Sequence, residues 1–340
     1  MSADRVGFGI RLPVAGTFAE TANIASVAEH AEALGYDALW VHDYLIWNED
    51  LDRRHVSCGS IETVREGRPP VFFESITTLA YLAALTTQIR LGFSVLVLPY
   101  REPIATAKQL ATLDTLSGGR LILGLGAGAP KKTGNVDFEV LGIDRRSKYD
   151  RLREYLEAMQ AIWTVDSAAY HGDYVDFEGA VVYPRPVQQP GPEIWMAGVS
   201  ERGMDLVARF AGGWLPTWLT PEGYRVKLDE LEQRLQGYGR ALGDVRIGDE
   251  IVVCLGTSDD DAVARSKATV GTFTSGFTAR SEEEALAASL IGSVETVGAR
   301  ARALADAGVQ HFEMKPIYHS VDDLKVQMER FASGVMAEFR

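Results

Sequence analysis

The sequence predicts an α/β fold of the (β/α)8 TIM-barrel type, and three observations lead to this prediction. Eight short β-rich runs alternate with longer amphipathic helical patterns along the 340 residues. Runs such as Ile89–Leu98 are apolar on both faces, as parallel strands covered by helices are. Barrels of this type commonly use such a length as one domain. A doubly wound sheet also alternates strands and helices, but it rarely needs eight evenly distributed units.

The expected elements follow one another in regular order. We expect strands at Val6–Leu12, Ala38–Val41, Ile89–Leu98, Leu121–Leu125, Ile194–Ala197, Gly213–Leu215, Glu250–Leu255 and His311–Met314. The helical pattern is clearest at Ala22–Leu34, Ser75–Leu85, Ile104–Leu116, Lys148–Ile162, Met204–Phe210, Glu222–Leu235 and Val294–Ala307. Gly35 and Gly308 follow two of these helices as stop signals. Because no convincing linker divides the chain, we expect a single domain over residues 1–340.

Three segments interrupt the alternation and are expected as insertions at the C-terminal mouth of the barrel. Residues 48–70 are polar and charged, residues 165–192 end in PRPVQQPGP, and residues 271–292 join TFTSGF to an acidic helical stretch. The active sites of TIM barrels lie at the carboxyl ends of the strands, where loops of this size shape the opening. The strand ends are therefore the places to search for functional residues.

Composition and charge exclude several classes of function. The chain has 34 Lys and Arg against 47 Asp and Glu, a formal net charge of −13, so we expect no nucleic-acid or anionic-membrane partner. Cys58 and Cys254 lack the spacing of metal ligands, and so few cysteines fit a reducing cytoplasm. The N-terminus lacks a signal-peptide pattern, and the longest apolar stretch, around Leu91–Leu98, is too short to span a bilayer. We expect a cytoplasmic protein without a metal site.

Side chains that can carry chemistry concentrate after the second strand. His42, Asp43 and Tyr44 follow Val41 directly, and Trp47 comes soon after. An imidazole exchanges protons near neutral pH, whereas a phenol with an ordinary pKa near 10 mainly donates a hydrogen bond. We expect His42 or Tyr44 as proton donor, Asp43 as a group that orients a neighbour or binds a cofactor, and Trp47 as an apolar wall. Because neighbouring strand residues point to opposite faces, this requires that the strand has ended by Asp43.

Later strand ends are rich in glycine and other small residues. In Gly124-Leu125-Gly126-Ala127-Gly128, alternate glycines let the backbone approach a flat ligand or a phosphate closely. The run Ala197-Gly198-Val199-Ser200 leads into a helix, whose N-terminus offers an anion site. Thr217 and Trp218 follow the sixth strand and are expected to contact substrate. A mouth with so few catalytic side chains suits a bound cofactor that carries the chemistry.

Over nearly its whole length the sequence resembles the bacterial luciferase-like monooxygenase family. The resemblance rests on Gly35–Trp40 with Asp43, Ile89–Gly92 through Pro99, Lys108–Asp114, Leu116–Leu121, Gly124-x-Gly126-x-Gly128, Tyr183–Gln188 with Ile194-Trp195, Gly212–Trp214 and Ala307–Val309. It implies a TIM barrel, which agrees with the strand count. It also implies a homodimer and an enzyme that uses reduced flavin mononucleotide (FMN) or the deazaflavin coenzyme F-420.

The resemblance implies roles for matched positions. In deazaflavin-dependent relatives a non-proline cis peptide in the third strand backs the cofactor ring, and Ser94-Val95 holds the matching position. The run from Ala197 to Ser200 matches the cofactor-contacting loop, and Gly126, Ala127 and Gly128 are expected to contact the cofactor as well. Tyr44 stands where the family has a histidine, and Ala129 stands where the glucose-6-phosphate-oxidising relatives have an acid. Both departures argue against that sugar dehydrogenase activity.

Other matched residues are interpreted as scaffold. Asp114 and Arg120 flank a tight turn and are expected to form a structural ion pair. Arg185 and Gln188 are interpreted as loop anchors. These four residues are therefore not counted in the candidate site.

The predicted function is that of an oxidoreductase acting on a small organic substrate. With reduced FMN it would be a monooxygenase, with a separate flavin reductase as a partner. With F-420 it would pass a hydride as a dehydrogenase or reductase, and the sequence does not separate the two. Two alternatives stay open: a barrel hydrolase or isomerase that uses His42 and Asp43, and a non-catalytic flavin-binding barrel.

Overall fold

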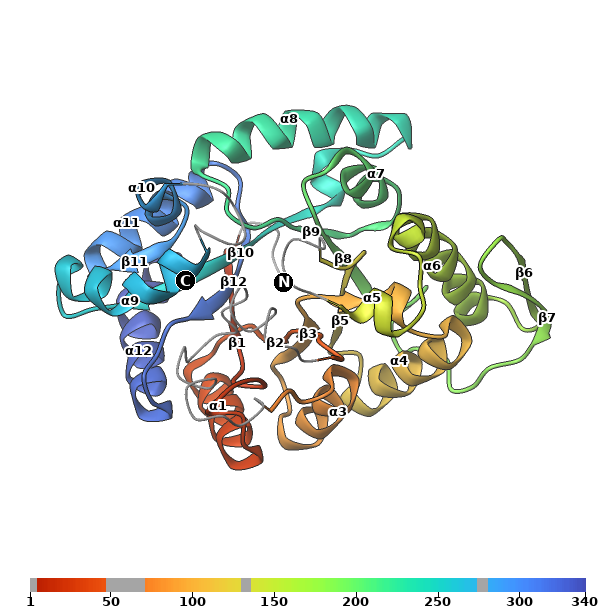
Figure 1. Cartoon of the computed structure of the whole chain (residues 1–340), viewed down its shortest axis with the longest axis horizontal. Helices are drawn as coiled ribbons and strands as arrows, with labels where there is room; N and C mark the ends of the chain where they lie inside the picture. The colour runs from red at the N-terminus through yellow and green to blue at the C-terminus, as the bar shows by residue number, and fades with distance from the viewer. Residues whose placement is uncertain (1–4, 47–70, 130–135, 274–280) are drawn as a thin grey trace.

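A closed parallel barrel forms the centre of the computed structural model, which describes residues 5–46, 71–129, 136–273 and 281–340 (Figure 1). The eight strands of the ring are β1 (Gly7–Arg11), β2 (Ala38–Val41), β3 (Arg90–Phe93), β5 (Leu121–Gly126), β8 (Glu193–Ala197), β9 (Gly213–Leu215), β10 (Arg246–Leu255) and β12 (His311–Pro316). Each pairs in parallel with the next, and β12 pairs back with β1. The predicted (β/α)8 barrel is confirmed.

Two strands differ from their predicted extents. The third is interrupted at Ser94-Val95, and a short β4 (Leu96–Val97) then pairs with β5. The seventh, β10, begins at Arg246 instead of Glu250. Its first residues include Gly248 and Asp249, which are rare in strands, but they are buried here and paired with β12. Pairing inside the barrel therefore overrides the local preference.

Helices cover the outside of the barrel. The seven expected helices are present as α1 (Thr21–Leu34), α3 (Ser75–Leu85), α4 (Pro103–Ser117), α6 (Lys148–Thr164), α7 (Glu201–Phe210), α8 (Pro221–Gly237) and α11 (Val294–Asp306). Gly35 caps α1 at φ 77°, as its stop signal predicts. Three helices of the described residues were not predicted, α5 (Asp137–Val140), α9 (Asp259–Phe273) and α12 (Val321–Gly334), whereas α10 (Glu282–Ala287) lies in the expected acidic helical stretch. Among the described residues, no helix is both long and apolar enough to cross a membrane.

The three predicted insertions differ in what the structure shows of them. Residues 48–70 lie outside the described residues. Within 165–192, β6 (Ala168–His171) and β7 (Asp176–Ala180) form an antiparallel pair at the outer edge of the molecule beside α6 (Figure 1). Within 271–292, β11 (Leu290–Gly292) joins the main sheet by pairing with the end of β10. The second and third segments thus contain regular structure, and β6 and β7 lie away from the strand ends where we expected them.

Two tryptophans fill the lower part of the barrel interior. A Cβ atom on Gly9 would lie 2.2 Å from Trp40 Nε1, and one on Gly213 would lie 2.3 Å from the Trp195 ring. The rings of Trp40 and Trp195 have centroids 5.8 Å apart, and His311 packs edge-on against both. Glycines on the inner face of the strands therefore create the space that the indoles occupy. We call Trp40, Trp195 and His311 the lower layer.

The expected ion pair between Asp114 and Arg120 is not formed. Asp114 accepts hydrogen bonds from the backbone N–H and the side-chain amide of Gln188 instead. Arg120 donates to the carbonyl oxygens of Ala83, Thr86 and Ile89. Both residues fix loops, as a scaffold role requires, but through different partners, because the turn directs their side chains apart.

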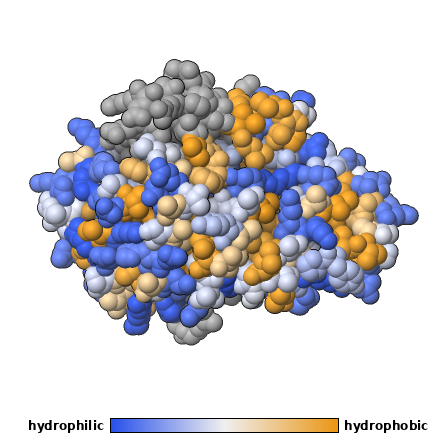
Figure 2. Space-filling view, turned by 90° about the horizontal axis from the view of Figure 1, so that it is seen from below, coloured by the Kyte–Doolittle hydropathy of each residue, from blue (hydrophilic) through white to orange (hydrophobic). Residues whose placement is uncertain are grey.

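The surface carries apolar residues in several separate groups among hydrophilic ones on the face shown in Figure 2. Exposed apolar side chains come from many elements, such as Tyr81 of α3, Leu116 of α4 and Val326 of α12. Scattered residues of this kind are normal on globular proteins. The homodimer implied by the resemblance therefore stays a prediction.

Candidate active site

A cavity of about 360 Å³ opens at the carboxyl ends of the strands. Its volume falls within the range of roughly 300–1,000 Å³ that is typical of small-molecule sites. Every predicted site residue that the structure describes lines it: His42, Asp43, Tyr44, Ser94, Val95, Gly126, Ala127, Gly128, Ala197, Gly198, Val199, Ser200, Thr217 and Trp218. Trp47 lies outside the described residues. The strand ends thus converge as the barrel prediction requires.

The carboxylate of Asp43 is held by protein groups. Arg101 donates to both of its oxygens, at 2.6 and 2.8 Å. The backbone N–H of Val97 and the hydroxyl of Ser75 donate at 2.9 and 3.0 Å, and the side chain is 1% exposed. This arrangement suits a residue that orients the strand-2 loop and the start of β4. It leaves little of the carboxylate for a cofactor or for proton transfer.

His42 and Tyr44 reach the cavity because β2 ends at Val41. The required end of the strand before Asp43 is therefore present. The two rings pack edge-on with their centroids 5.5 Å apart. Each also packs edge-on against Phe72, with centroid distances of 6.3 Å for His42 and 6.0 Å for Tyr44. Burial raises the pKa of the Tyr44 phenol well above its usual value, so the phenol stays protonated. Tyr44 can donate a hydrogen bond there, and His42 is the side chain suited to exchange a proton.

The glycines of β5 face the interruption of the third strand. The peptide bond between Ser94 and Val95 is cis, as the resemblance implies. A Cβ on Gly124 would lie 1.7 Å from the carbonyl oxygen of Phe93, and one on Gly126 would lie 2.4 Å from the Val95 side chain. Both glycines thus face protein atoms of the bulge, and Gly126 also lines the cavity, so its expected contact with the cofactor stays a prediction. They allow the third strand to bulge toward the cavity.

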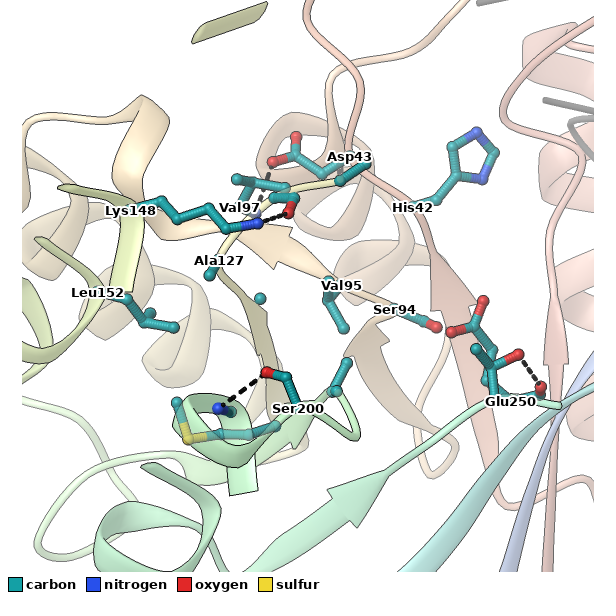
Figure 3. A pocket seen from close by; sticks show the side chains of 18 of the residues that line it. His42, Asp43, Ser94, Val95, Val97, Ala127, Lys148, Leu152, Ser200 and Glu250 are labelled. Carbon is teal, nitrogen blue, oxygen red and sulfur yellow. Dashed lines mark hydrogen bonds between the residues drawn. The ribbon is translucent and has the colours of Figure 1, made fainter. Parts of the chain in front are cut away.

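The N-terminus of α7 forms one end of the cavity. Ser200 caps this helix by accepting a hydrogen bond from the N–H of Gly203, and the Tyr149 hydroxyl lies 2.9 Å from Ser200 Oγ. Lys148 reaches the carbonyl of Gly128 at 3.0 Å (Figure 3), and burial lowers the pKa of its ammonium group. A helix N-terminus, two hydroxyls and a lysine together provide donors for an anion. We call this the α7 end of the cavity.

Buried charged side chains form the opposite end of the cavity. Arg11 donates to Glu250 Oε1 at 3.0 Å and to Ser94 Oγ at 2.7 Å. Lys315 forms an ion pair with the same Glu250 oxygen. Behind them, Glu313 accepts two hydrogen bonds from Arg11 at 2.8 and 3.1 Å and is fully buried. We call Arg11, Glu250 and Lys315 the floor.

The floor carboxylates have opposite pKa shifts. Burial opposes ionisation of Glu250, but Lys315 and Arg11 outweigh it and lower the pKa of Glu250 to about 2. Burial raises the pKa of Glu313, and the nearby charge of Glu250 adds to this in spite of Arg11. Glu250 is therefore ionised at neutral pH, while Glu313 holds its proton more tightly than an exposed carboxyl does.

Thr217 and Trp218 complete the wall between the two ends. The hydroxyl of Thr217 donates to the backbone carbonyl of Glu250 at 2.9 Å (Figure 3). Trp218 is 5% exposed and has a φ of +62°, a left-handed conformation that bulky residues rarely adopt. Such a conformation persists only where the surroundings impose it. The indole is therefore a fixed wall of the cavity.

The floor and two residues of the α7 end were not predicted from the sequence. The signal for the floor was present in the last strand, His311-Phe312-Glu313-Met314-Lys315, where charged and apolar residues alternate. In a strand this pattern directs every charged side chain to one face. For Lys148 and Tyr149 the sequence offered no such signal, because both belong to the first turn of a helix.

Comparisons with known proteins assign the chain to a family. The family model of luciferase-like monooxygenases matches residues 8–311. The chain belongs to this family. The predicted family is thus confirmed, and with it the class of oxidoreductases. Among the described residues, no group of three or more His, Cys, Asp or Glu side chains could hold a metal ion.

Relatives in this family differ in activity. The chain is 29% identical over 194 residues to an FMNH₂-dependent dimethylsulfone monooxygenase of Pseudomonas putida, a match that covers 56% of this chain and 51% of that enzyme. It is also 29% identical over 269 residues to a phthiodiolone/phenolphthiodiolone dimycocerosates ketoreductase of Mycobacterium sp. (strain JLS). That match covers 77% of this chain and 68% of the ketoreductase. The chain thus matches about half the length of the Pseudomonas enzyme.

Solved structures of two F420-dependent enzymes have the same barrel fold. The F420-dependent tetrahydromethanopterin reductase of Methanopyrus kandleri superposes with a TM-score of 0.78 at 21% identity, over 99% of this chain and 100% of that chain. An F420-dependent secondary alcohol dehydrogenase superposes with a TM-score of 0.81 at 16% identity, over 99% of both chains. At these identities the likeness shows the fold.

Proposed function

We propose that this oxidoreductase binds reduced FMN or coenzyme F-420 in the mouth cavity and acts on a small organic substrate. The observation that carries the proposal is that one cavity is lined by both the N-terminus of α7 and His42. Both cofactors carry a phosphate, which needs donors of the kind found at the α7 end. Relatives that use FMNH₂ and relatives that use F420 both occur in the family.

The residues present fit a flat cofactor of this kind. Val95 and Ala127 present apolar groups to the cavity (Figure 3), and Ala197, Gly198 and Val199 add a rim of small or apolar residues. Ser200, Tyr149 and Lys148 would hold the phosphate. When bound, the cofactor supplies the hydride or the activated oxygen, and the protein supplies position and polarity.

The chain's own acid–base group is His42 in this proposal. His42 lies beside Tyr44, whose protonated phenol donates a hydrogen bond to substrate or cofactor. Thr217 and Trp218 would enclose the substrate. The alternative of a hydrolase or isomerase that uses His42 with Asp43 is not favoured, because Asp43 is held by Arg101.

Titration of the apoprotein with FMN and with F-420, each oxidised and anaerobically reduced, tests the cofactor directly. We expect one of them to bind with a change in its fluorescence, and Ser200→Ala to weaken that binding. His42→Gln and Tyr44→Phe should retain binding, and His42→Gln should lose about 10²- to 10⁴-fold in turnover. Binding of neither cofactor would contradict the proposal, and near-normal turnover of His42→Gln would remove His42 from its assigned role.

The last part of the proposal concerns the oligomeric state of the protein and its cellular compartment. We propose one barrel domain over residues 1–340 that forms a homodimer in the cytoplasm, as the family resemblance and the two cysteines of the chain suggest. With FMN, a separate reductase would supply the reduced cofactor. Sedimentation as a monomer at micromolar concentration would contradict the dimer.

A further inference from the structure

We propose that the floor binds an anionic group of the substrate, so that the enzyme selects small organic oxyanions such as carboxylates. This inference rests on the proposed function, because it assigns the cofactor to the α7 end and leaves the floor to the substrate. Neither Arg11 nor Lys315 has a role in holding the cofactor or in the acid–base chemistry assigned to His42.

The charge of the cavity is opposite to that of the protein. The chain carries a formal charge of −13, yet the described cavity lining contains three cations, Arg11, Lys148 and Lys315, against Asp43 and Glu250. Asp43 is already neutralised by Arg101, which lies outside the lining. Glu250 pairs with both Arg11 and Lys315, and Glu313 behind the lining pairs with Arg11 as well, yet the cations of the lining still outnumber the carboxylates that Arg101 does not neutralise. A cavity of this kind attracts anions even in an acidic protein.

The cations lie at two separate ends. Lys148 belongs to the α7 end, whereas Arg11 and Lys315 belong to the floor with Glu250, and Figure 3 shows Lys148 and Glu250 on opposite sides of the cavity. A cofactor phosphate at the α7 end would engage Lys148. The two cations of the floor share Glu250 as a partner, and we assign to this pair a second anion, which is the substrate's.

The floor is rigid and poorly solvated. The side chain of Arg11 is 3% exposed and that of Lys315 is 10% exposed, and both project from barrel strands, β1 and β12. In such surroundings a hydrogen bond from a charged donor to an anion is stronger than in water. Glu313 lies behind the floor, outside the cavity lining, so it offers no surface to a cationic ligand. Glu250 opposes the bound anion and thereby sets its affinity.

The test compares three ligands of one shape. Holoenzyme with FMN or F-420 is titrated with hexanoate, hexanamide and hexylamine, and binding is followed by cofactor fluorescence and by calorimetry. We expect hexanoate to bind most tightly. Lys315→Met should lower the affinity for hexanoate about ten- to hundredfold, as expected for loss of a charged hydrogen bond. The affinity for hexanamide should change by less than about twofold. Glu250→Gln should strengthen hexanoate binding, an outcome that damage to the fold would not produce.

A reciprocal variant separates the two ends. Lys148→Met should weaken binding of the cofactor and leave the preference for hexanoate over hexanamide unchanged. The inference is overturned if hexanoate does not bind, if the three ligands bind equally, if hexylamine is preferred or if Lys315→Met leaves the preference intact. If neither cofactor binds, the proposed function fails, and titration of the apoprotein with the three ligands by calorimetry still decides the inference.

Discussion

Two layers of the same barrel interior have opposite chemistry. The lower layer consists of Trp40, Trp195 and His311, packed against glycines of the neighbouring strands. The layer above it, at the mouth, consists of the floor with Glu313. A single strand, β12, supplies His311 to the lower layer and Glu313 and Lys315 to the upper one.

This difference separates stability from function within a few residues of each strand. The lower layer is closed by large rings without room for a ligand, so its contribution is packing. The upper layer buries charges, which is tolerated because each has an ionic partner at hydrogen-bond distance. Barrels commonly place stability at the lower end and chemistry at the carboxyl ends of the strands, and both properties here come from the same alternation.

The largest expected effect tests the lower layer. Trp40 is fully buried, so Trp40→Ala should lower the free energy of unfolding by about 3–5 kcal/mol, through lost contacts and a cavity that its glycine neighbours cannot fill. Chemical denaturation measures the change. Leu116→Ala, at a side chain that is 66% exposed, is the matched control and should change it by less than about 0.5 kcal/mol. A small effect of Trp40→Ala would show that the layer does not support the barrel.

The next effect tests whether Asp43 is structural. Asp43→Asn removes a buried charge that Arg101 contacts with two nitrogens, so we expect a loss of about 2–3 kcal/mol of stability. A double-mutant cycle with Arg101→Gln measures the coupling of the two residues. If Asp43 instead contacts the cofactor, its replacement will lower cofactor affinity strongly while stability stays nearly constant.

The difference between the layers also explains what the sequence could predict. The strand ends at His42, Ser94, Gly126 and Ser200 were found from local patterns, because a barrel brings all carboxyl ends to one face. Their arrival in one cavity needed no further information. The indole packing in the lower layer was hidden, since it depends on which glycine of one strand faces which tryptophan of another.

The floor could not be predicted as a unit for a similar reason. More than two hundred residues separate Arg11 from Glu250 and Lys315 along the chain. Only the closure of the barrel brings them together. The alternation in the last strand predicts a charged face but not its partners. Likewise, the turn at Asp114 and Arg120 suggested a pair, whereas the partner of Asp114 is Gln188, far along the chain.

The two layers should change the stability of the protein in opposite directions as the pH rises. In the upper layer the group that titrates is Glu313. Its pKa is raised from 4.5 to about 7, so the folded state holds the proton more tightly than the unfolded state does. This contribution, on the order of 3 kcal/mol, is fully present below pH 4.5 and is lost as the pH rises through about 7. Glu313→Gln should remove this decline, so the stability of the variant relative to the wild type should rise between pH 4.5 and 7, as measured by denaturation at a series of pH values. An unchanged slope would show that Arg11 keeps Glu313 ionised.

His311 in the lower layer should act in the opposite direction. Burial, with Arg246 and Arg90 nearby, lowers its pKa well below 6.5, so protons bind the unfolded state in preference. Stability should therefore fall as the pH drops below 6.5. In His311→Gln this loss on acidification should be smaller than in the wild type. Because the two contributions oppose each other between pH 4.5 and 6.5, each single variant should show the slope of the remaining group, and the double variant should lose both slopes.

The smallest expected effect lies at the α7 end, where the site consists mainly of backbone. Tyr149→Phe removes one hydrogen bond, between the phenol and Ser200 Oγ at 2.9 Å, and leaves the helix N-terminus and Lys148 in place. A single neutral hydrogen bond near solvent contributes about 0.5–1.5 kcal/mol, so cofactor affinity should fall about two- to tenfold. Fluorescence titration with FMN or F-420 measures it, and Tyr183→Phe, at a residue that is 57% exposed, is the control. A loss of a hundredfold or more would mean that the phenol itself is a principal ligand, and the α7 end would then depend on side chains as much as the floor does.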